Sequence, residues 1–207
     1  SQAKCFPKGV TRMSWVVLGL IVFFLLFLVS AYNRLVTARN GFKNAFAQID
    51  VQLTRRHDLI PNLVETAKGA SKIEQSTLEG VIEARASATQ VKLSTDDLND
   101  PAKVQAFQQA QGNVSSTLGR LLATVEAYPD LKSQARFADL MTQLEGTENR
   151  INVTVQDYNA AVQDYNTTIR TFPDIIGAKI VHGAQPMTPY KAITPNANVA
   201  PKVDFGQ

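Results

Sequence analysis

One short run of this sequence carries side chains suited to acid–base chemistry. Residues 55–65 read RRHDLIPNLVE, so two arginines are followed directly by His57 and Asp58. A histidine can act as a general base when a carboxylate orients it, and the two groups must then lie within hydrogen-bonding distance. Side chains of adjacent residues diverge on a helix or a turn, so His57 and Asp58 alone do not form such a pair.

A second charged cluster occurs in LEGTENR, residues 144–150. Glu145 and Glu148 are three residues apart and can share one face of a helix. If this face meets residues 55–65, the charges form either a structural network or the site of a membrane-anchored hydrolase or metal-binding protein. We favour the network, because a partly buried carboxylate is ordinarily paired with an arginine. Its candidate members are Arg55, Arg56, Asp58, Glu145, Glu148 and Arg150.

The rest of the sequence adds no catalytic motif. It contains no P-loop, no dinucleotide-binding glycine motif, no GxSxG and no HExxH. Its only cysteine, Cys5, excludes both a disulfide within the chain and a cysteine zinc site. The net charge of +3 is too small to indicate nucleic-acid binding. We therefore predict a protein with no enzymatic activity, no catalytic or metal-binding residues, no cofactor and no nucleic-acid partner.

The elements that position these clusters are expected to be helices. Apolar residues recur at helical spacing throughout residues 35–172, and no segment alternates as a half-buried strand does. This period predicts an all-α fold, with a long antiparallel, up-and-down bundle over residues 32–181 and coiled-coil-like seams. Residues 182–207 contain four dispersed prolines and no helical pattern, so we expect an extended tail there.

The charged run itself is interpreted as a junction between two helices. Pro61 is tolerated in the first turn of a helix, whereas in the interior it costs about 3 kcal/mol. We therefore expect Arg55 and Arg56 to end the first helix, where cations suit the negative helix end. Asp58 is then expected to cap the second helix.

Two further boundaries follow from prolines. Asp100 is expected to cap a third helix whose first residue is Pro101. The residue before Pro129 is pushed out of the helical conformation, so the third helix ends there. The fourth helix is expected to run from Pro129 to Phe172 and to be the longest of the soluble part.

The tripeptide DYN occurs twice in the fourth helix, seven residues apart, around Tyr158 and Tyr165. A repeat at this distance is typical of heptad packing, in which the tyrosine rings lie in the seam. A binding site is the alternative. We favour packing.

An apolar segment, residues 13–31, precedes the predicted bundle. No charged residue interrupts it between Trp15 and Val29, and it is long enough to cross the roughly 30 Å hydrocarbon layer. Trp15 and Tyr32 stand at its ends, where amphipathic rings favour the membrane interface. We expect an uncleaved transmembrane helix in preference to a cleaved signal peptide, with residues 1–12 as an N-terminal extension.

Four stretches resemble the LemA family. They are YNRLVTARNGFKNAFAQIDVQLTRRHDLIPNLVETAKG (32–69), RLLATVEAYPDLKSQARFADLMTQLEGTENRI (120–151), YNAAVQDYNTTIRTFP (158–173) and APKVDF (200–205). The resemblance implies an N-terminal membrane anchor, a long antiparallel helical bundle, and no established enzymatic activity or cofactor. Some relatives carry a lipoprotein cysteine just before the YN that corresponds to Tyr32-Asn33. The absence of a cysteine at residues 29–31 favours a transmembrane anchor here.

The expected function is that of a non-enzymatic helical scaffold in a bacterial inner membrane, crossing the bilayer once. Positive charges flank the apolar segment almost equally on both sides, so the side of the bundle stays open, with the periplasm preferred. The expected partners are the lipid bilayer and either a second copy or another membrane or envelope protein. The fourth predicted helix carries the fourth apolar stripe, from Leu140 to Phe172. Self-association is expected because helices of unequal length leave part of this stripe uncovered.

Overall fold

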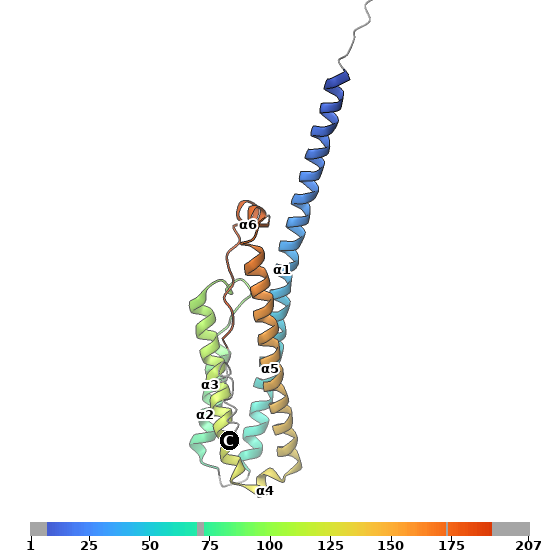
Figure 1. The fold of residues 1–207 in the computed structure, drawn as a ribbon. Coiled ribbons are helices and arrows are strands. Elements are labelled where there is room, and N and C mark those ends of the chain that lie inside the picture. The colour runs from blue at the N-terminus through green and yellow to red at the C-terminus, as the bar shows by residue number, and fades with distance from the viewer. Residues whose placement is uncertain (1–7, 70–72, 173, 192–207) are drawn as a thin grey trace, which may run out of the picture.

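A computed structural model describes residues 8–69, 73–172 and 174–191 of the 207. Within these residues every regular element is a helix, which confirms the all-α fold (Figure 1). The helices are α1 Lys8–Lys68, α2 Gln75–Gln90, α3 Pro101–Glu126, α4 Pro129–Lys132, α5 Ala135–Thr168 and α6 Asp174–His182. Cys5 and residues 192–207 of the expected tail lie outside the described residues.

The first half of α1 projects from the bundle, and its second half is part of it (Figure 1). In the projecting half, apolar side chains from Met13 to Leu26 are exposed, and Trp15 and Tyr32 are exposed as well. An 18-residue window of this helix has a mean hydropathy of 2.6, so the helix is long and apolar enough to cross a membrane by length and composition. From Leu35 onward, the side of α1 that faces α5 is buried.

Helices α1 and α5 run antiparallel, with Phe42 against Tyr165 and Phe46 against Tyr158. Helices α2 and α3 pack on each other and complete the bundle. Its interior consists of two apolar cores, one in each half of the rod. The core nearer the projecting half of α1 contains Leu35, Phe42, Phe46, Ile49, Leu53, Val104, Phe107, Ile151, Val155, Tyr158, Val162 and Tyr165. The distal core contains Ile60, Leu63, Val64, Ala67, Leu78, Val81, Val114, Leu118, Leu121, Val125, Leu131, Phe137, Leu140 and Leu144.

The expected break at residues 55–61 is wrong, because α1 continues through Pro61 to Lys68. A proline lacks the N–H group that would bond to the carbonyl four residues earlier, here the carbonyl of His57. The Arg85 side chain on α2 replaces that donor, since its Nε–H bonds to the His57 oxygen at 2.7 Å. Continuing the helix also buries Ile60 and Leu63, at about 1.5–3 kcal/mol each, which outweighs the proline penalty.

The expected fourth helix over residues 129–172 is also wrong in detail. It is interrupted after α4 by an extended backbone at Gln134, and α5 ends at Thr168. Leu131 and Phe137 are both buried in the distal core, although residues six apart on a straight helix point to different sides. The turn between α4 and α5 brings both side chains inward. Phe172, expected in the apolar stripe, is 77% exposed.

The boundary predicted at Asp100 and Pro101 is confirmed. The Asp100 carboxylate accepts hydrogen bonds from the backbone N–H groups of Ala102 and Lys103, at 2.9 and 3.3 Å. These N–H groups have no partner within the helix, so the cap satisfies donors that water would otherwise have to satisfy. The cap fixes the start of α3 and thereby the height at which its polar residues enter the bundle.

Candidate functional site

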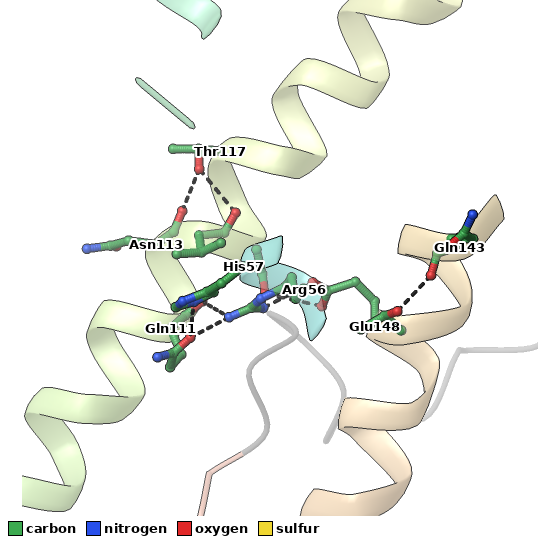
Figure 2. Close-up of polar contacts among 10 residues, drawn as sticks. Arg56, His57, Gln111, Asn113, Thr117, Gln143 and Glu148 are labelled. Atoms are coloured by element: carbon green, nitrogen blue, oxygen red, sulfur yellow. Dashed lines mark hydrogen bonds and ion pairs between the residues drawn. The ribbon is translucent and has the colours of Figure 1, made fainter. Parts of the chain in front are cut away.

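Arg56 lies at the centre of a polar layer between the two apolar cores. Its side chain is 0% exposed, and it reaches from α1 toward both α3 and α5 (Figure 2). Its Nη1 donates to Glu148 Oε1 at 3.0 Å and to Ser115 Oγ at 2.8 Å. Its Nη2 donates to the side-chain oxygen of Gln111 at 2.6 Å and to the Gln111 carbonyl at 3.3 Å. One guanidinium therefore joins three helices.

His57, on the next position of α1, completes the layer from the other side. Its Nε2 lies 3.2 Å from the Gln111 side-chain oxygen, which also accepts from Arg56. That oxygen can only accept, so Nε2 carries the proton of a neutral imidazole. Burial, and after it the neighbouring charge of Arg56, lowers the pKa of His57 below the ordinary 6.5. The imidazole therefore stays neutral in the folded protein at pH 7.

Glu148 closes the layer on α5. Its second carboxylate oxygen accepts from the Ser115 hydroxyl at 3.3 Å, so arginine, serine and carboxylate form a closed ring of contacts. The Glu148 side chain is 31% exposed, whereas the Arg56 side chain is fully covered. The pair thus combines a desolvated cation with a carboxylate that keeps part of its hydration, which reduces the desolvation cost of the pair.

The other residues expected in the network are not in this layer. Arg55 and Asp58 are exposed on α1, and Glu145 and Arg150 are exposed on α5. Only Arg56 and Glu148 of the six candidates are brought together. The layer is instead completed by Gln111 and Ser115 of α3, which sequence reasoning did not include. The sequence gives only a weak indication that these residues belong to the layer. Gln111 is a polar residue at a position where the apolar stripe of α3 requires a buried side chain.

This arrangement is suited to holding helices together. The four donor contacts of Arg56 are all made to protein oxygens, and His57 is held by the amide that Arg56 also contacts. The described residues contain no group of three or more His, Cys, Asp or Glu side chains placed to hold a metal ion. Glu148, the carboxylate of this layer, is already engaged by Arg56.

A second polar site occurs on α5, in the half of the bundle nearer the projecting part of α1. Asn159 and Asn166, the asparagines of the two DYN repeats, each bind the backbone of an extended segment, residues 183–191, which we call the strap. Figure 1 shows this segment running beside α5 after α6. Asn166 donates to the Met187 carbonyl at 2.9 Å and accepts from its N–H at 2.8 Å. Asn159 makes the same pair of bonds to Tyr190, both at 2.7 Å.

The spacing of this asparagine ladder fits an extended chain. Seven residues of an α-helix rise about 10.5 Å, and three residues of an extended segment rise about 10 Å. Asn159 and Asn166 can therefore meet residues 187 and 190 in the same way. The strap is further fixed by Tyr158, whose hydroxyl donates to the Thr188 carbonyl at 2.9 Å. Burial raises the pKa of Tyr158, so this donor keeps its proton.

The strap also contributes to the apolar core. Tyr190 is 2% exposed and packs edge-on against Phe107 of α3. Tyr158 and Tyr165 are themselves buried, as heptad packing requires, while the asparagines that follow them bind the strap. The packing interpretation of the DYN repeat therefore holds for its tyrosines.

Comparisons with known proteins identify one family and several relatives. The chain matches the LemA family over residues 45–205. Protein LemA of Metamycoplasma hominis is 26% identical over 175 residues, which cover 83% of this chain and 75% of that protein. Magnetosome protein MamQ 2 of Paramagnetospirillum magneticum is 30% identical over 154 residues, or 67% of this chain and 57% of that protein. Magnetosome protein MamQ of Magnetospirillum gryphiswaldense is 27% identical over 147 residues, or 63% and 54%. The chain thus spans little more than half of the magnetosome proteins, and none of these names states an enzymatic reaction.

Proposed function

The chain belongs to the LemA family, and we propose that it is a non-enzymatic scaffold that is anchored in a membrane and presents a helical rod to partner proteins. The observation that carries this proposal is α1, in which a single helix from Lys8 to Lys68 contains both the exposed apolar span and the face packed against α5. A helix without a break transmits orientation along its length. The bundle is therefore held at a defined angle to the membrane.

The Arg56 layer supports a structural role over a catalytic one. Its guanidinium, amide and carboxylate are paired with one another, and Arg56 itself is fully buried. A hydrolase or a metal-binding protein would need a reactive group directed at open space. The layer instead joins α1, α3 and α5 at one height, which suits a rod that must keep its register.

The asparagine ladder supports recognition of extended segments. It contacts the strap through main-chain atoms of Met187 and Tyr190, so its contacts place few demands on the sequence that is held. Binding an extended segment through its backbone, with one side chain buried as an anchor, is a general mode of protein–protein recognition. In this chain the anchor is the buried Tyr190.

Self-association remains part of the proposal, on a different ground from the one expected. The fourth apolar stripe is not left uncovered, because residues from Leu140 to Tyr165 along it are buried within one chain. The support comes from Val51 and Val153, which are 57% and 56% exposed. Both lie midway between the Phe46–Tyr158 and Arg56–Glu148 contacts, hence at the same height of the rod.

Carbonate extraction of membranes tests the anchor. We expect the full-length chain to stay with the membrane pellet, because burial of the apolar span in lipid does not depend on charge. Release of the intact chain into the supernatant would contradict the proposal.

Light scattering of the full-length chain in detergent tests self-association. We expect a protein mass above that of one 22.7 kDa chain, and a decrease toward that mass in a variant with Val51→Ser and Val153→Ser. A mass of one chain at every concentration would leave another protein as the only partner of the scaffold.

We further propose a single pass through a bacterial inner membrane with the rod in the periplasm. Arg150 is exposed on α5, so a cysteine introduced there by Arg150→Cys, in a Cys5→Ser background, is open to labelling. Modification by a membrane-impermeant maleimide in cells with a permeable outer membrane is expected. Labelling only after lysis would place the rod in the cytoplasm.

A further inference from the structure

A pocket lies where α1 leaves the bundle toward the apolar span. It has a volume of about 620 Å³ and is bounded by α1, the loop before α3, α5 and the strap. This size is typical of pockets that hold small molecules or headgroups. None of the side chains of the Arg56 layer lines it.

Two cations from α1 stand on one wall of this pocket. Arg39 is exposed and forms no hydrogen bond or ion pair within the described part of the chain. Lys43, one turn further, lies 3.9 Å from Asp96, whose side chain is 85% exposed. An ion pair with so much exposure is weak and yields to a competing anion. The two cations outnumber the single carboxylate of the pocket.

The pocket is directed toward the membrane. Its lining begins at Tyr32, at the end of the apolar span, and the wall next to it is formed by Leu35 and Val36. Arg39 and Lys43 lie about 10 and 16 Å further along the helix. Helical side chains lean toward the N-terminal end of their helix, which for α1 is the membrane end. The pocket is therefore apolar beside the bilayer and basic just above it, a distribution that matches an amphiphile.

We propose that this pocket binds the headgroup of an anionic phospholipid whose acyl chains remain in the leaflet beside α1. The phosphate oxygens accept hydrogen bonds from the guanidinium of Arg39 and the ammonium of Lys43, as phosphates do elsewhere. The polar side chains of Asn40 and Thr95, which also line the pocket, face the uncharged hydroxyls of such a headgroup. The inference rests on the proposed function, because only an anchored chain brings the pocket to a bilayer.

The test uses the full-length chain in nanodiscs of phosphatidylcholine, with and without phosphatidylglycerol. Lipids that stay bound are counted by native mass spectrometry after release into mild detergent. The variant Arg39→Gln/Lys43→Gln is compared with Arg120→Gln/Lys132→Gln, which removes the same charge from exposed positions in the distal half. We expect retained phosphatidylglycerol on the wild-type chain and on the distal variant. The pocket variant is expected to bind it about thirtyfold more weakly, at about 1 kcal/mol per cation near an anionic surface.

Each outcome decides the matter. Equal retention by both variants would overturn the site. A parallel arm adds inorganic phosphate to phosphatidylcholine nanodiscs, and a rise in melting temperature that Arg39→Gln/Lys43→Gln abolishes would show a site for free phosphate in place of lipid. Failure of the chain to enter nanodiscs of either composition would contradict the membrane anchor itself, so the two proposals fail in distinguishable ways.

Discussion

The Arg56 layer and the asparagine ladder are two polar regions of one rod that differ in charge and in what they hold. The layer is charged, lies between the two apolar cores and joins helix to helix through side chains. The ladder is neutral, lies along α5 and joins the helix to the backbone of the strap. Removing the partner of a buried charge is strongly destabilising, whereas replacing an amide by another polar group costs only the free energy of one hydrogen bond. The layer should therefore control global stability, and the ladder should control a local opening.

The largest effect is expected for Arg56→Ala. Removing the guanidinium leaves Gln111, Ser115 and Glu148 without their common donor and opens a cavity between the cores. Breaking a buried pair on one side typically costs about 3–5 kcal/mol. Denaturant unfolding of the full-length chain in detergent measures it. The matched control is Arg55→Ala, the exposed neighbour, for which we expect a change within about 0.5 kcal/mol. Equal effects of the two substitutions would remove the distinction between layer and surface.

A smaller effect is expected for Arg85→Ala, which removes the donor to the His57 carbonyl beside Pro61. A hydrogen bond from a charged group contributes about 2 kcal/mol, so the unfolding free energy should fall by about that amount. The same substitution should cost less in a Pro61→Ala background, because an alanine at this position restores the backbone N–H that bonds to the carbonyl. A double-mutant cycle measures the difference, and additivity would mean that Arg85 does not compensate for the proline.

The substitution Asn166→Asp tests whether the asparagine ladder controls a local opening of the strap and not the global stability. The carboxylate still accepts from the Met187 N–H but no longer donates to its carbonyl, so about 1 kcal/mol of local stability should be lost. Hydrogen exchange of the Met187 and Tyr190 amides should accelerate, while the global unfolding midpoint changes little. Asn149→Asp, on the exposed side of α5, serves as the control. Unchanged exchange at Met187 would show that the strap is held by its other contacts.

The smallest expected effect is a pH dependence from His57. Burial and the charge of Arg56 lower its folded pKa, so between 6.5 and that lowered value the unfolded chain binds a proton that the folded chain does not. Stability is therefore full above pH 6.5 and declines as the pH falls below it. Unfolding midpoints at neutral and mildly acidic pH measure this, and the decline should be smaller in His57→Gln. An identical decline in both proteins would assign it to other groups.

The helical faces were predictable because burial imposes a period. The third apolar stripe was expected from Val104 to Tyr128, and its residues from Val104 to Val125 are the buried face of α3, which ends at Glu126. The cap at Asp100 depends only on neighbouring residues. The break at Pro61 was mispredicted because its compensation comes from Arg85, 28 residues away along the chain from His57. Local rules contain no information on such a contact.

The Arg56 layer and the asparagine ladder were predictable from the sequence to different degrees, because local rules contain no information on contacts between distant residues. Arg56 and Glu148 were singled out because charges in a helical repeat stand out, but their exposed neighbours looked equivalent in sequence. The helical period distinguishes Arg56 from its exposed neighbour Arg55. Arg56 lies on the buried side of α1, between Leu53 and Ile60, whereas Arg55 does not lie on that side. The ladder was not predicted, because the partners of its asparagines are backbone atoms of residues 187 and 190, which leave no mark in the sequence pattern.

The central claim is that the charged cluster is a structural layer, and a double-mutant cycle between Arg56→Met and Glu148→Leu tests it most directly. Each single substitution leaves one charge or its polar partners unpaired, whereas the double variant replaces both members of the pair with apolar groups. We predict that the double variant is more stable than the sum of the single effects implies, by about 1 kcal/mol or more. Strict additivity of the two unfolding free energies would contradict the account.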